Sequence, residues 1–257
     1  MNLLLLAGSG ESRAIATALK GVSGLGVRAS LAGRTKRPMA LDCPTRIGGF
    51  GGAEGFRGYL CQEKIDAVLD ATHPFATRMS ATAATVCHEL GCAHLQLLRP
   101  PWREDPVRPW LHATCEADAA RHIPPGATVF LATGPARIRD FANLQGRHLI
   151  CRRIDSPKHP FPFPNGQYMV ARPPFDVAEE KALFQELGVD CLVLRNAGGA
   201  PSRPKLDAAI ELGLKVVMID RPAPLDCARC NSVSAALDWV RARLSDVHPS
   251  DVRLSNG

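Results

Sequence analysis

The sequence predicts an α/β protein made of two three-layer units, each with a parallel sheet, related by internal duplication. Three observations predict this class. Short apolar segments alternate with longer amphipathic segments, which is typical of parallel strands joined by helices. Features of the first half of the chain recur in the same order in the second half. The chain has 257 residues, 46% of them apolar, and can therefore bury a substantial core.

The first predicted strand, residues 3–7, runs directly into a turn rich in small residues. Small residues let the backbone curl after a buried strand, so that the N–H groups at the start of the next helix face an anion. The dinucleotide fingerprint G-x-G-x-x-G would continue with a third small residue, but this chain has arginine there. The motif alone therefore only suggests a cofactor phosphate site, formed by Gly8, Ser9, Gly10, Glu11, Ser12 and Arg13.

The second predicted strand, residues 27–32, leads through Gly33 into a basic stretch with Arg34, Thr35 and Lys36. An NAD-binding fold would hold the ribose 2′-hydroxyl with an acid at this point, and no acid is present. Guanidinium groups bind phosphate oxygens in a planar, bidentate way, so the stretch favours NADP with its 2′-phosphate. A solvated basic loop is the alternative interpretation.

A third predicted strand, residues 68–71, ends in Thr72-His73-Pro74-Phe75. Proline suits the first turn of a helix, so we expect the following helix to begin near Pro74. His73 would then lie at the ligand edge of the sheet, where it could hydrogen-bond a cofactor or donate a proton. The residues leave this role and that of a capping or core histidine equally open.

The second half of the chain repeats this arrangement. A shift of 124 residues places Gly10 on Gly134, Arg13 on Arg137 and Asp66 on Asp190. The remaining predicted strands cover residues 95–98, 129–132, 190–193 and 216–219, and the predicted helices cover 56–64 and 179–187. So many matches in one order favour duplication over chance.

The strand end in the second half is followed by Arg195-Asn196-Ala197-Gly198-Gly199 and, further on, by Arg203 and Lys205. Two glycines permit a ligand to approach the backbone closely, and the basic side chains would match carboxylates on a substrate. A glycine-rich turn with solvated bases is an equally good interpretation of this segment.

We expect the domain boundary within residues 103–127, where a short helix around residues 115–121 is bracketed by Pro106, Pro109, Pro124, Pro125 and Gly126. This gives a nucleotide-binding half at 1–125, a substrate-facing half at 126–245 and a tail at 246–257. The last helix, residues 233–244, has an apolar face and is expected to be docked.

Composition excludes several functions. The nine cysteines are scattered and odd in number, which fits reduced thiols in a cytoplasmic protein, and the pair Cys227-x-x-Cys230 lacks further zinc ligands at comparable spacing. We therefore expect no metal.

The formal charge of +6 suits an anionic small molecule, whereas few aromatics and no recognition motif argue against nucleic acid. No segment has the length or composition of a signal peptide or membrane span, and no hydrolase or kinase motif is present.

With these segments in view, nearly the whole chain resembles the precorrin-6A reductases, NADPH-dependent enzymes of cobalamin biosynthesis. The string Ala-Thr-His-Pro-Phe-Ala at residues 71–76 is the most specific part of the resemblance. Where family members commonly have Lys-Asn-Ser-Gly-Gly, this chain has Arg-Asn-Ala-Gly-Gly at 195–199, which keeps the charge and lacks the hydroxyl. The resemblance also rests on the segments 8–13, 30–35, 48–52, 99–102 and 171–175.

The resemblance implies two Rossmann-like halves, with NADPH on the first half and the tetrapyrrole precorrin-6A in an active-site cleft between the halves. Whether the halves exchange a strand is left open. It implies reduction of one carbon–carbon double bond, with hydride from the nicotinamide and a proton to the neighbouring carbon from water or His73. Thr72 and His73 would help to bind the cofactor. The implied substrate-binding residues are Phe75, Arg99, Gly134, Arg172, Arg195, Asn196, Gly198, Gly199 and Lys205.

Two alternatives remain open at this point. One is an NADP-dependent reductase of another polyanionic substrate, and the other is a protein that binds NADP or a tetrapyrrole without catalysis. Neighbouring enzymes of the pathway are further candidate partners. The basic residues in the second half favour a protein that faces a substrate with carboxylates.

Overall fold

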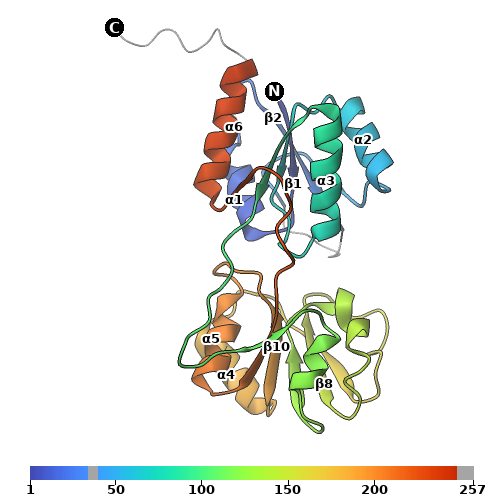
Figure 1. Ribbon diagram of the computed structural model, residues 1–257, viewed down its shortest axis with the longest axis vertical. Coiled ribbons are helices and arrows are strands. Elements are labelled where there is room, and N and C mark those ends of the chain that lie inside the picture. Colours follow the sequence, from blue (N-terminus) through green and yellow to red (C-terminus); the bar gives the residue numbers. More distant parts are fainter. Residues whose placement is uncertain (34–39, 248–257) are drawn as a thin grey trace. The chain divides into compact units, whose positions relative to one another are not determined.

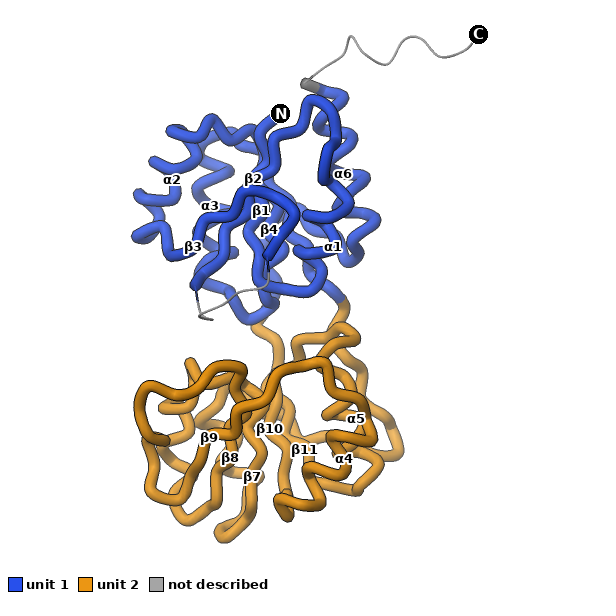
Figure 2. Tube along the Cα trace, turned by 180° about the vertical axis from the view of Figure 1, so that it is seen from behind, with its two compact units in different colours: residues 1–99, 223–257 blue, residues 100–222 orange. Residues whose placement is uncertain are grey.

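The computed structural model describes residues 1–33 and 40–247. The chain forms two compact units, which are coloured separately in Figure 2. Unit 1 contains residues 1–99 and the chain from 223 onward, and unit 2 contains residues 100–222. This division differs from the predicted boundary at 125/126, because residues after 100 already pair with the sheet of unit 2 and the last helix packs in unit 1.

Unit 1 is a parallel sheet of six strands in the order β12-β5-β4-β1-β2-β3, covered by helices on both faces (Figure 1). The strands are β1 (Asn2–Leu6), β2 (Gly26–Leu31), β3 (Thr45–Ile47), β4 (Ala67–Asp70), β5 (Ala93–Leu97) and β12 (Arg229–Cys230). The helices are α1 (Gly10–Ala18), α2 (Ala53–Gln62), α3 (Thr77–Leu90) and α6 (Val233–Val247).

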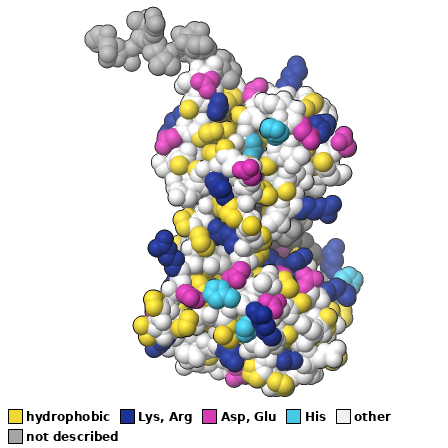
Figure 3. Space-filling model, viewed as in Figure 1, with side chains coloured by type: hydrophobic (Ala, Val, Ile, Leu, Met, Phe, Trp, Pro, Cys, Tyr) yellow, Lys and Arg dark blue, Asp and Glu magenta, His cyan; other side chains and the backbone are white. Residues whose placement is uncertain are grey.

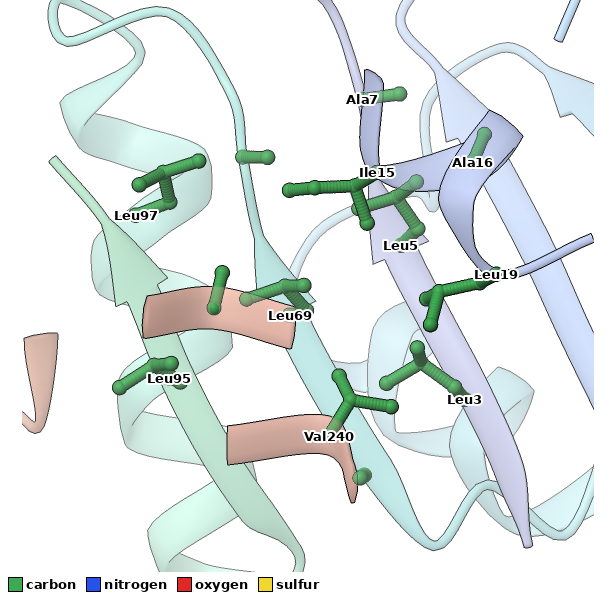
Figure 4. Close-up of a cluster of buried hydrophobic side chains, with 13 residues drawn as sticks. Leu3, Leu5, Ala7, Ile15, Ala16, Leu19, Leu69, Leu95, Leu97 and Val240 are labelled. Carbon is green, nitrogen blue, oxygen red and sulfur yellow. The ribbon is translucent and has the colours of Figure 1, made fainter. Parts of the chain in front are cut away.

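The two faces of this sheet have separate cores. On one face, α1 and α6 pack on the alternate residues Leu3 and Leu5 of β1, and Figure 4 shows Ile15 and Val240 meeting this layer. On the other face, α2 and α3 pack on Leu4 and Leu6. Because strand side chains alternate between faces, a strand covered on both faces must be apolar throughout. This explains the run of leucines that opens the sequence.

Unit 2 is also a parallel sheet of six strands, in the order β6-β11-β10-β7-β8-β9. The strands are β6 (Leu111–Ala113), β7 (Thr128–Leu131), β8 (His148–Arg153), β9 (Gly166–Val170), β10 (Cys191–Arg195) and β11 (Lys215–Ile219). Two α-helices, α4 (Val177–Glu186) and α5 (Arg203–Glu211), and two 3₁₀ helices, η1 (Asp118–His122) and η2 (Pro135–Phe141), complete the unit.

Both sheets have the strand order 3-2-1-4-5-6 of the doubly wound dinucleotide-binding fold, once each unit's strands are counted from β1 or β7. The predicted fold class and the internal duplication are therefore confirmed. In such sheets the switch point lies between the first and fourth strands, which are β1 and β4 in unit 1 and β7 and β10 in unit 2.

The sixth strand of each sheet is exchanged between the halves. β6 follows β5 in the chain but pairs with β11 of unit 2, in the register Leu111 with Val217. β12 follows β11 in the chain but pairs with β5 of unit 1, in the register Arg229 with Gln96. These strands are only three and two residues long, so no alternating pattern in the sequence marks them.

Local predictions were correct in type and shifted in detail. The helix expected near Pro74 begins at Thr77, because Pro74 lies in the preceding turn. The short helix expected at 115–121 is the 3₁₀ helix η1. The last helix continues to Val247, so the predicted tail from 246 starts inside it, and residues 248–257 lie outside the described residues.

Two properties of the described residues concern the partners that the sequence argues against, nucleic acid and membranes. Figure 3 shows acidic and basic side chains interspersed on the visible face of each unit rather than one continuous basic surface. Among the described helices, none combines the length and apolar character needed to cross a membrane.

Candidate functional site

The turn after β1 is fixed by reciprocal hydrogen bonds around Ser9 and Ser12. The hydroxyl of Ser9 accepts a hydrogen bond from the amide of Ser12 (3.2 Å), and the hydroxyl of Ser12 accepts from the amides of Gly8 (3.2 Å) and Ser9 (3.3 Å). Gly8 has φ +142°, which only glycine adopts readily, and a Cβ there would meet no atom within 4 Å. Helix geometry leaves the amides of Gly10 and Glu11 without intrahelical acceptors, so the positive helix end faces outward.

Arg13 departs from the fingerprint without disturbing this turn. In the fingerprint, the third glycine lets the helix pack closely on the strand. Here Ser12 is the small residue buried against the sheet, whereas Arg13 is exposed on the outer side of α1. An arginine at this position therefore does not obstruct helix packing.

A pocket lies at the switch point of unit 1, where β1 and β4 are neighbours and α1 and α3 cover opposite faces. The hydroxyl of Ser9 donates to the carbonyl oxygen of Ala71 (2.8 Å) and so ties the two strand ends together. Ligands of doubly wound proteins bind in this crevice, beyond the carboxyl ends of the strands. The pocket is lined by Ser9, Glu11, Thr72, Pro74, Leu97 and Arg99.

An ion pair crosses the pocket. Nη1 of Arg99 lies 2.7 Å from Oε2 of Glu11, and the two side chains are 16% and 20% exposed. Arg99 follows β5, whereas Glu11 is in the first turn of α1. Arg99 therefore reaches the helix end at the switch point of unit 1, and its guanidinium neutralises the carboxylate there.

Thr72 and His73 sit in the turn between β4 and α3. The amide of Thr72 donates to Oδ1 of the buried Asp70 (3.0 Å), and the Thr72 hydroxyl lies 3.3 Å from that of Ser80. The amide of Phe75 donates to Nδ1 of His73 (3.2 Å). Because Nδ1 accepts, the neutral imidazole carries its proton on Nε2, which is the atom able to donate to a ligand.

Three predicted cofactor residues, Arg34, Thr35 and Lys36, lie outside the described residues. The preceding Gly33, at the end of the β2 segment, is exposed and has φ +72°. The basic stretch therefore remains a prediction from the sequence.

In unit 2, Arg195 is the last residue of β10 and pairs with Glu116. Its Nε donates to Oε1 of Glu116 (3.0 Å), and Arg137 lies 3.5 Å from the other carboxylate oxygen. Burial alone would raise the pKa of Glu116, but the hydrogen bond and charge of Arg195 outweigh it and hold this pKa below its ordinary value. The predicted substrate arginine is thus already matched with a buried acid.

Gly134 and Arg172 also lie at this carboxyl edge. Gly134 follows β7 with φ +82° and is the N-cap of η2, whereas Gly10, its counterpart in the repeat, is the first residue of α1. Arg172 follows β9 and pairs with Asp155 at 3.0 Å, and its side chain is 58% exposed. An exposed pair of this kind is weak enough for a ligand carboxylate to compete.

The glycine-rich segment after Arg195 has a structural role that the sequence did not reveal. Oδ1 of Asn196 accepts from the amide of Trp102 (2.8 Å), and Nδ2 donates to the Trp102 carbonyl (3.1 Å). Nε1 of Trp102 donates to the carbonyl of Gly199 (3.0 Å). A Cβ on Gly198, at φ +67°, would come within 2.0 Å of the Pro100 carbonyl oxygen. Buried Asn196 and Gly198 are therefore required by the chain around Trp102 and Pro100.

Lys205, in the first turn of α5, differs from Arg195 because it is largely buried and has no ion pair among the described residues. Burial lowers the pKa of its ammonium group, the charge of Glu180 opposes this, and that of Arg152 adds to it. Glu180 itself forms a bidentate pair with Arg152, at 3.0 Å from Nη1. No carboxylate of the described residues comes within 4 Å of Lys205, whose Nζ donates at 3.4 Å to the Ser202 carbonyl. An anionic ligand would match this charge.

Comparison with known proteins decides the family. A family model described as "Precorrin-6x reductase CbiJ/CobK" matches residues 2–241. The chain is 44% identical over 241 residues to precorrin-6A reductase of Mycobacterium tuberculosis, which covers 93% of this chain and 96% of that protein. The chain belongs to the precorrin-6A reductase family. Precorrin-6A reductase of Rhodococcus erythropolis is 41% identical over 240 residues, with the same two coverages of 93% and 96%.

The fold agrees with a solved member of the precorrin-6A reductase family. A structure titled "CobK precorrin-6A reductase" matches with a TM-score of 0.88 and 39% identity, covering 94% of this chain and 96% of that one. Precorrin-6A reductases are oxidoreductases of cobalamin biosynthesis that act on a carbon–carbon double bond, so the resemblance seen in the sequence is confirmed.

Several residues that organise this precorrin-6A reductase fold were not singled out from the sequence. They are the counterions Glu116 and Glu180, the residue Trp102 that Asn196 holds through its backbone, and Arg46 in the middle of β3. The sequence repeat marks Arg13 and Arg137 as equivalent positions. The structure shows that the two differ, because Arg137 approaches the buried Glu116 and no such pair is found for Arg13 among the described residues. No group of three metal-ligating side chains occurs among residues 1–33 and 40–247.

Proposed function

We propose that this precorrin-6A reductase family member reduces one carbon–carbon double bond of precorrin-6A with NADPH, and that unit 1 holds the dinucleotide. The observation that carries the proposal is the capped turn at the β1/β4 switch point, where outward-facing amides adjoin the pocket lined by Ser9, Thr72 and Arg99.

The residues present fit the pyrophosphate of a dinucleotide. The space over Gly8 is open, since an added Cβ would meet nothing within 4 Å. The amides of Gly10 and Glu11 provide hydrogen-bond donors at the positive end of α1. The carboxylate of Glu11 would repel phosphate, but Arg99 pairs with it at 2.7 Å. Ser9 and Ser12 hold the turn in shape rather than contacting phosphate directly, because their hydroxyls bond to the backbone.

The choice of NADPH over NADH rests on the sequence after Gly33. Arg34 and Lys36 follow the strand at whose end an NAD-binding fold keeps an acid for the 2′-hydroxyl. Cationic side chains at that point would bind the 2′-phosphate of NADPH.

Unit 2 would meet the carboxylates of the tetrapyrrole. We assign Lys205 and Arg172 this role, because Lys205 has no ion pair among the described residues and the pair of Arg172 is exposed. Arg99 and Arg195 would contact the substrate while still paired with Glu11 and Glu116. Asn196, Gly198 and Gly199 would support the site through Trp102 rather than contact the substrate.

The main task of the protein in this reaction is to position the two reactants. The dihydronicotinamide supplies the hydride when it is bound, so the protein has to align it with one face of the macrocycle and exclude competing reactions. We assign Nε2 of His73, the protonated nitrogen of the neutral ring, as the donor at the pocket rim beside Thr72. A water molecule held there would serve the same proton transfer.

The test is direct. Purified protein is mixed with NADPH and precorrin-6A, and NADPH absorbance and the mass of the tetrapyrrole are followed together. Loss of NADPH with a product heavier by the mass of two hydrogen atoms is the expected result. A folded sample that consumes no NADPH, or that consumes NADH equally well, would contradict the proposal.

A further inference from the structure

A buried carboxylate of unit 1 has no counterion among the described residues. Asp70 is the last residue of β4, and none of its surface is exposed. Its Oδ1 accepts a hydrogen bond from the Thr72 amide (3.0 Å), whereas Oδ2 is buried without a hydrogen-bond partner. No lysine or arginine of residues 1–33 and 40–247 comes within 4 Å of either oxygen. Burying a carboxylate without a counterion destabilises a protein, so such a group points to a functional role.

His94, on the neighbouring strand β5, does not supply the missing positive charge. In the register of β4 with β5, Val68 lies opposite His94. Because Asp70 is two residues after Val68, it points to the same face of the sheet as His94. Burial lowers the pKa of His94, and the charge of Asp70 opposes this effect without overcoming it. The imidazole is therefore neutral at neutral pH and does not cancel the charge of Asp70.

The carboxylate of Asp70 lies behind the wall of the pocket at the switch point. Leu6 of β1 is the residue opposite Asp70, so the two strands end at the same level. The next residue, Ala71, accepts a hydrogen bond from the Ser9 hydroxyl (2.8 Å), and Thr72 lines the pocket. Asp70 therefore holds a residue of the pocket wall from its buried side.

Glu11 is a second acid at this pocket, but its charge is already balanced. Arg99 pairs with it at 2.7 Å. The fields of two opposite charges in contact largely cancel at a distance, whereas a single buried charge is poorly screened by solvent. Of these two acids, Asp70 is the one whose negative charge can act on a bound ligand.

The position of Asp70 relates it to one half of the dinucleotide. The residues proposed for the 2′-phosphate follow β2, on the opposite side of β1 from β4. A dinucleotide binds across the switch point with one half on each side, so the nicotinamide half belongs on the side of β4, where Thr72 lines the pocket. Dihydronicotinamide is neutral, and the ring that has given up its hydride carries a positive charge.

We propose that the buried carboxylate of Asp70 stabilises the positive charge of the oxidised nicotinamide, acting from behind Thr72 without touching the cofactor. The inference rests on the proposed use of NADPH by unit 1. The carboxylate is in place before the reaction, so its field favours the developing charge without reorganisation. Asp70 exchanges no atom or electron with either reactant. The same carboxylate positions Thr72, and the two effects are separable by experiment.

The test compares two oxidation states of the cofactor on the full-length protein, with NADP⁺ and NADPH as the probes. Asp70→Asn removes the charge and keeps an oxygen that can accept from the Thr72 amide. Asp66→Asn is the matched control, because Asp66 precedes β4 at its other end and also accepts a backbone amide, that of Asn2 (2.6 Å). Calorimetry measures the dissociation constants of both probes for all three proteins.

For Asp70→Asn we expect NADP⁺ to be weakened about tenfold and NADPH less than about twofold, because only NADP⁺ has the positive ring. With precorrin-6A, kcat should fall while the KM for NADPH stays near its wild-type value. Asp66→Asn should match wild type in each measurement. Equal weakening of both probes by Asp70→Asn would reduce Asp70 to a residue that positions Thr72 and would overturn the electrostatic role. An unchanged ratio of the two constants would overturn it as well.

Asp70→Ser keeps the test decisive if the asparagine variant does not fold. Serine is smaller than aspartate, carries no charge, and its hydroxyl can also accept from the Thr72 amide. It should change the ratio of the two dissociation constants in the same direction. A change of equal size in Asp66→Asn would overturn the assignment to Asp70. All these outcomes leave the use of NADPH intact, whereas wild-type protein that binds neither NADP⁺ nor NADPH would overturn both proposals.

Discussion

Arg99 and Glu11 form an ion pair of 2.7 Å across the pocket of unit 1, joining the residue that follows β5 to the first turn of α1. A carboxylate at a helix N-terminus stabilises the helix, but it also occupies the place where an anionic ligand gains from the same dipole. Arg99 cancels that negative charge. The charge of the pocket is therefore set by the pair and not by either residue alone.

We expect Arg99→Ala to weaken NADPH binding by about tenfold, because an unpaired Glu11 would then repel phosphate. Glu11→Gln should leave affinity equal or slightly improved, and the double variant should recover most of the loss. Titration of all four proteins with NADPH measures this cycle. Additive losses would show that Arg99 acts independently of Glu11.

Arg34→Ala should weaken NADPH about tenfold or more and change NADH affinity less than about twofold, because only NADPH has the 2′-phosphate. Arg78→Ala, an exposed arginine on α3, is the control. Fluorescence titration with both cofactors gives the two ratios. Equal weakening of NADPH and NADH by Arg34→Ala would exclude the phosphate role.

Lys205→Met should raise the KM for precorrin-6A about tenfold, with Lys181→Met on α4 as the control. Burial lowers the pKa of Lys205, so wild type should lose substrate affinity on the alkaline side at a pH below the ordinary lysine value. Lys205→Arg, which stays charged, should move this loss to higher pH. A KM independent of residue 205 would remove it from the substrate site.

Gly198→Ala should destabilise unit 2 strongly, whereas Gly213→Ala should cost about 1 kcal/mol. Both glycines have similar φ, +67° and +70°, but only at position 198 would the Cβ meet another atom, the Pro100 carbonyl oxygen at 2.0 Å. Urea denaturation of both variants isolates the effect of the contact. Similar losses at the two positions would mean that the segment near Pro100 relaxes freely.

His112, on the exchanged strand β6, should make stability depend on pH. Nδ1 lies 2.7 Å from Asp220 and Nε2 lies 3.2 Å from Glu104, and the hydrogen bond with Asp220 is the main reason that its pKa is raised. The Arg121 and His122 side chains contact His112 through its backbone carbonyl and not through its ring, and Arg121 also pairs with Asp118 at 3.2 Å. Stabilisation is complete below the unfolded pKa of about 6.5 and is lost as pH rises through the folded value.

Thermal unfolding of wild type and His112→Gln between about pH 6 and about pH 9 measures this dependence. The difference in midpoint between the two proteins should shrink as the pH rises. A constant difference across that range would mean that the charge of His112 does not contribute.

Much of the fold was readable because its signals are local. The leucine run of β1 is apolar at every position since helices cover both faces of the sheet, and the small-residue turn predicted after it is present, with Ser9 as the N-cap of α1. The repeat identified two related units. The exchanged strands could not be predicted from the sequence, because β6 and β12 are too short to show an alternating pattern and the strands they pair with are distant in the sequence.

The candidate site divides in the same way. The sequence found the turn at Gly8–Arg13, the residues after β4 and the basic strand ends. It assigned Asn196 and Gly198 to the substrate site, and it did not show that Trp102 and Pro100 approach these residues, because a glycine-rich turn gives no indication of its neighbours. It also did not show that Glu11, Glu116 and Asp155 already pair with predicted substrate arginines.

The sequence by itself determined the α/β class, the duplication, the small-residue turn after β1 and the resemblance to the precorrin-6A reductases, since these depend on periodicity and on short motifs whose chemistry is local. Only the tertiary structure decided which arginines are balanced by acids, which glycines serve the fold and which strand completes each sheet. Those outcomes depend on contacts between residues far apart in the chain. The effect of a buried charge on stability and binding depends on the counterion that the fold places beside it. The effect of a glycine depends in the same way on which atom the fold brings close to its backbone.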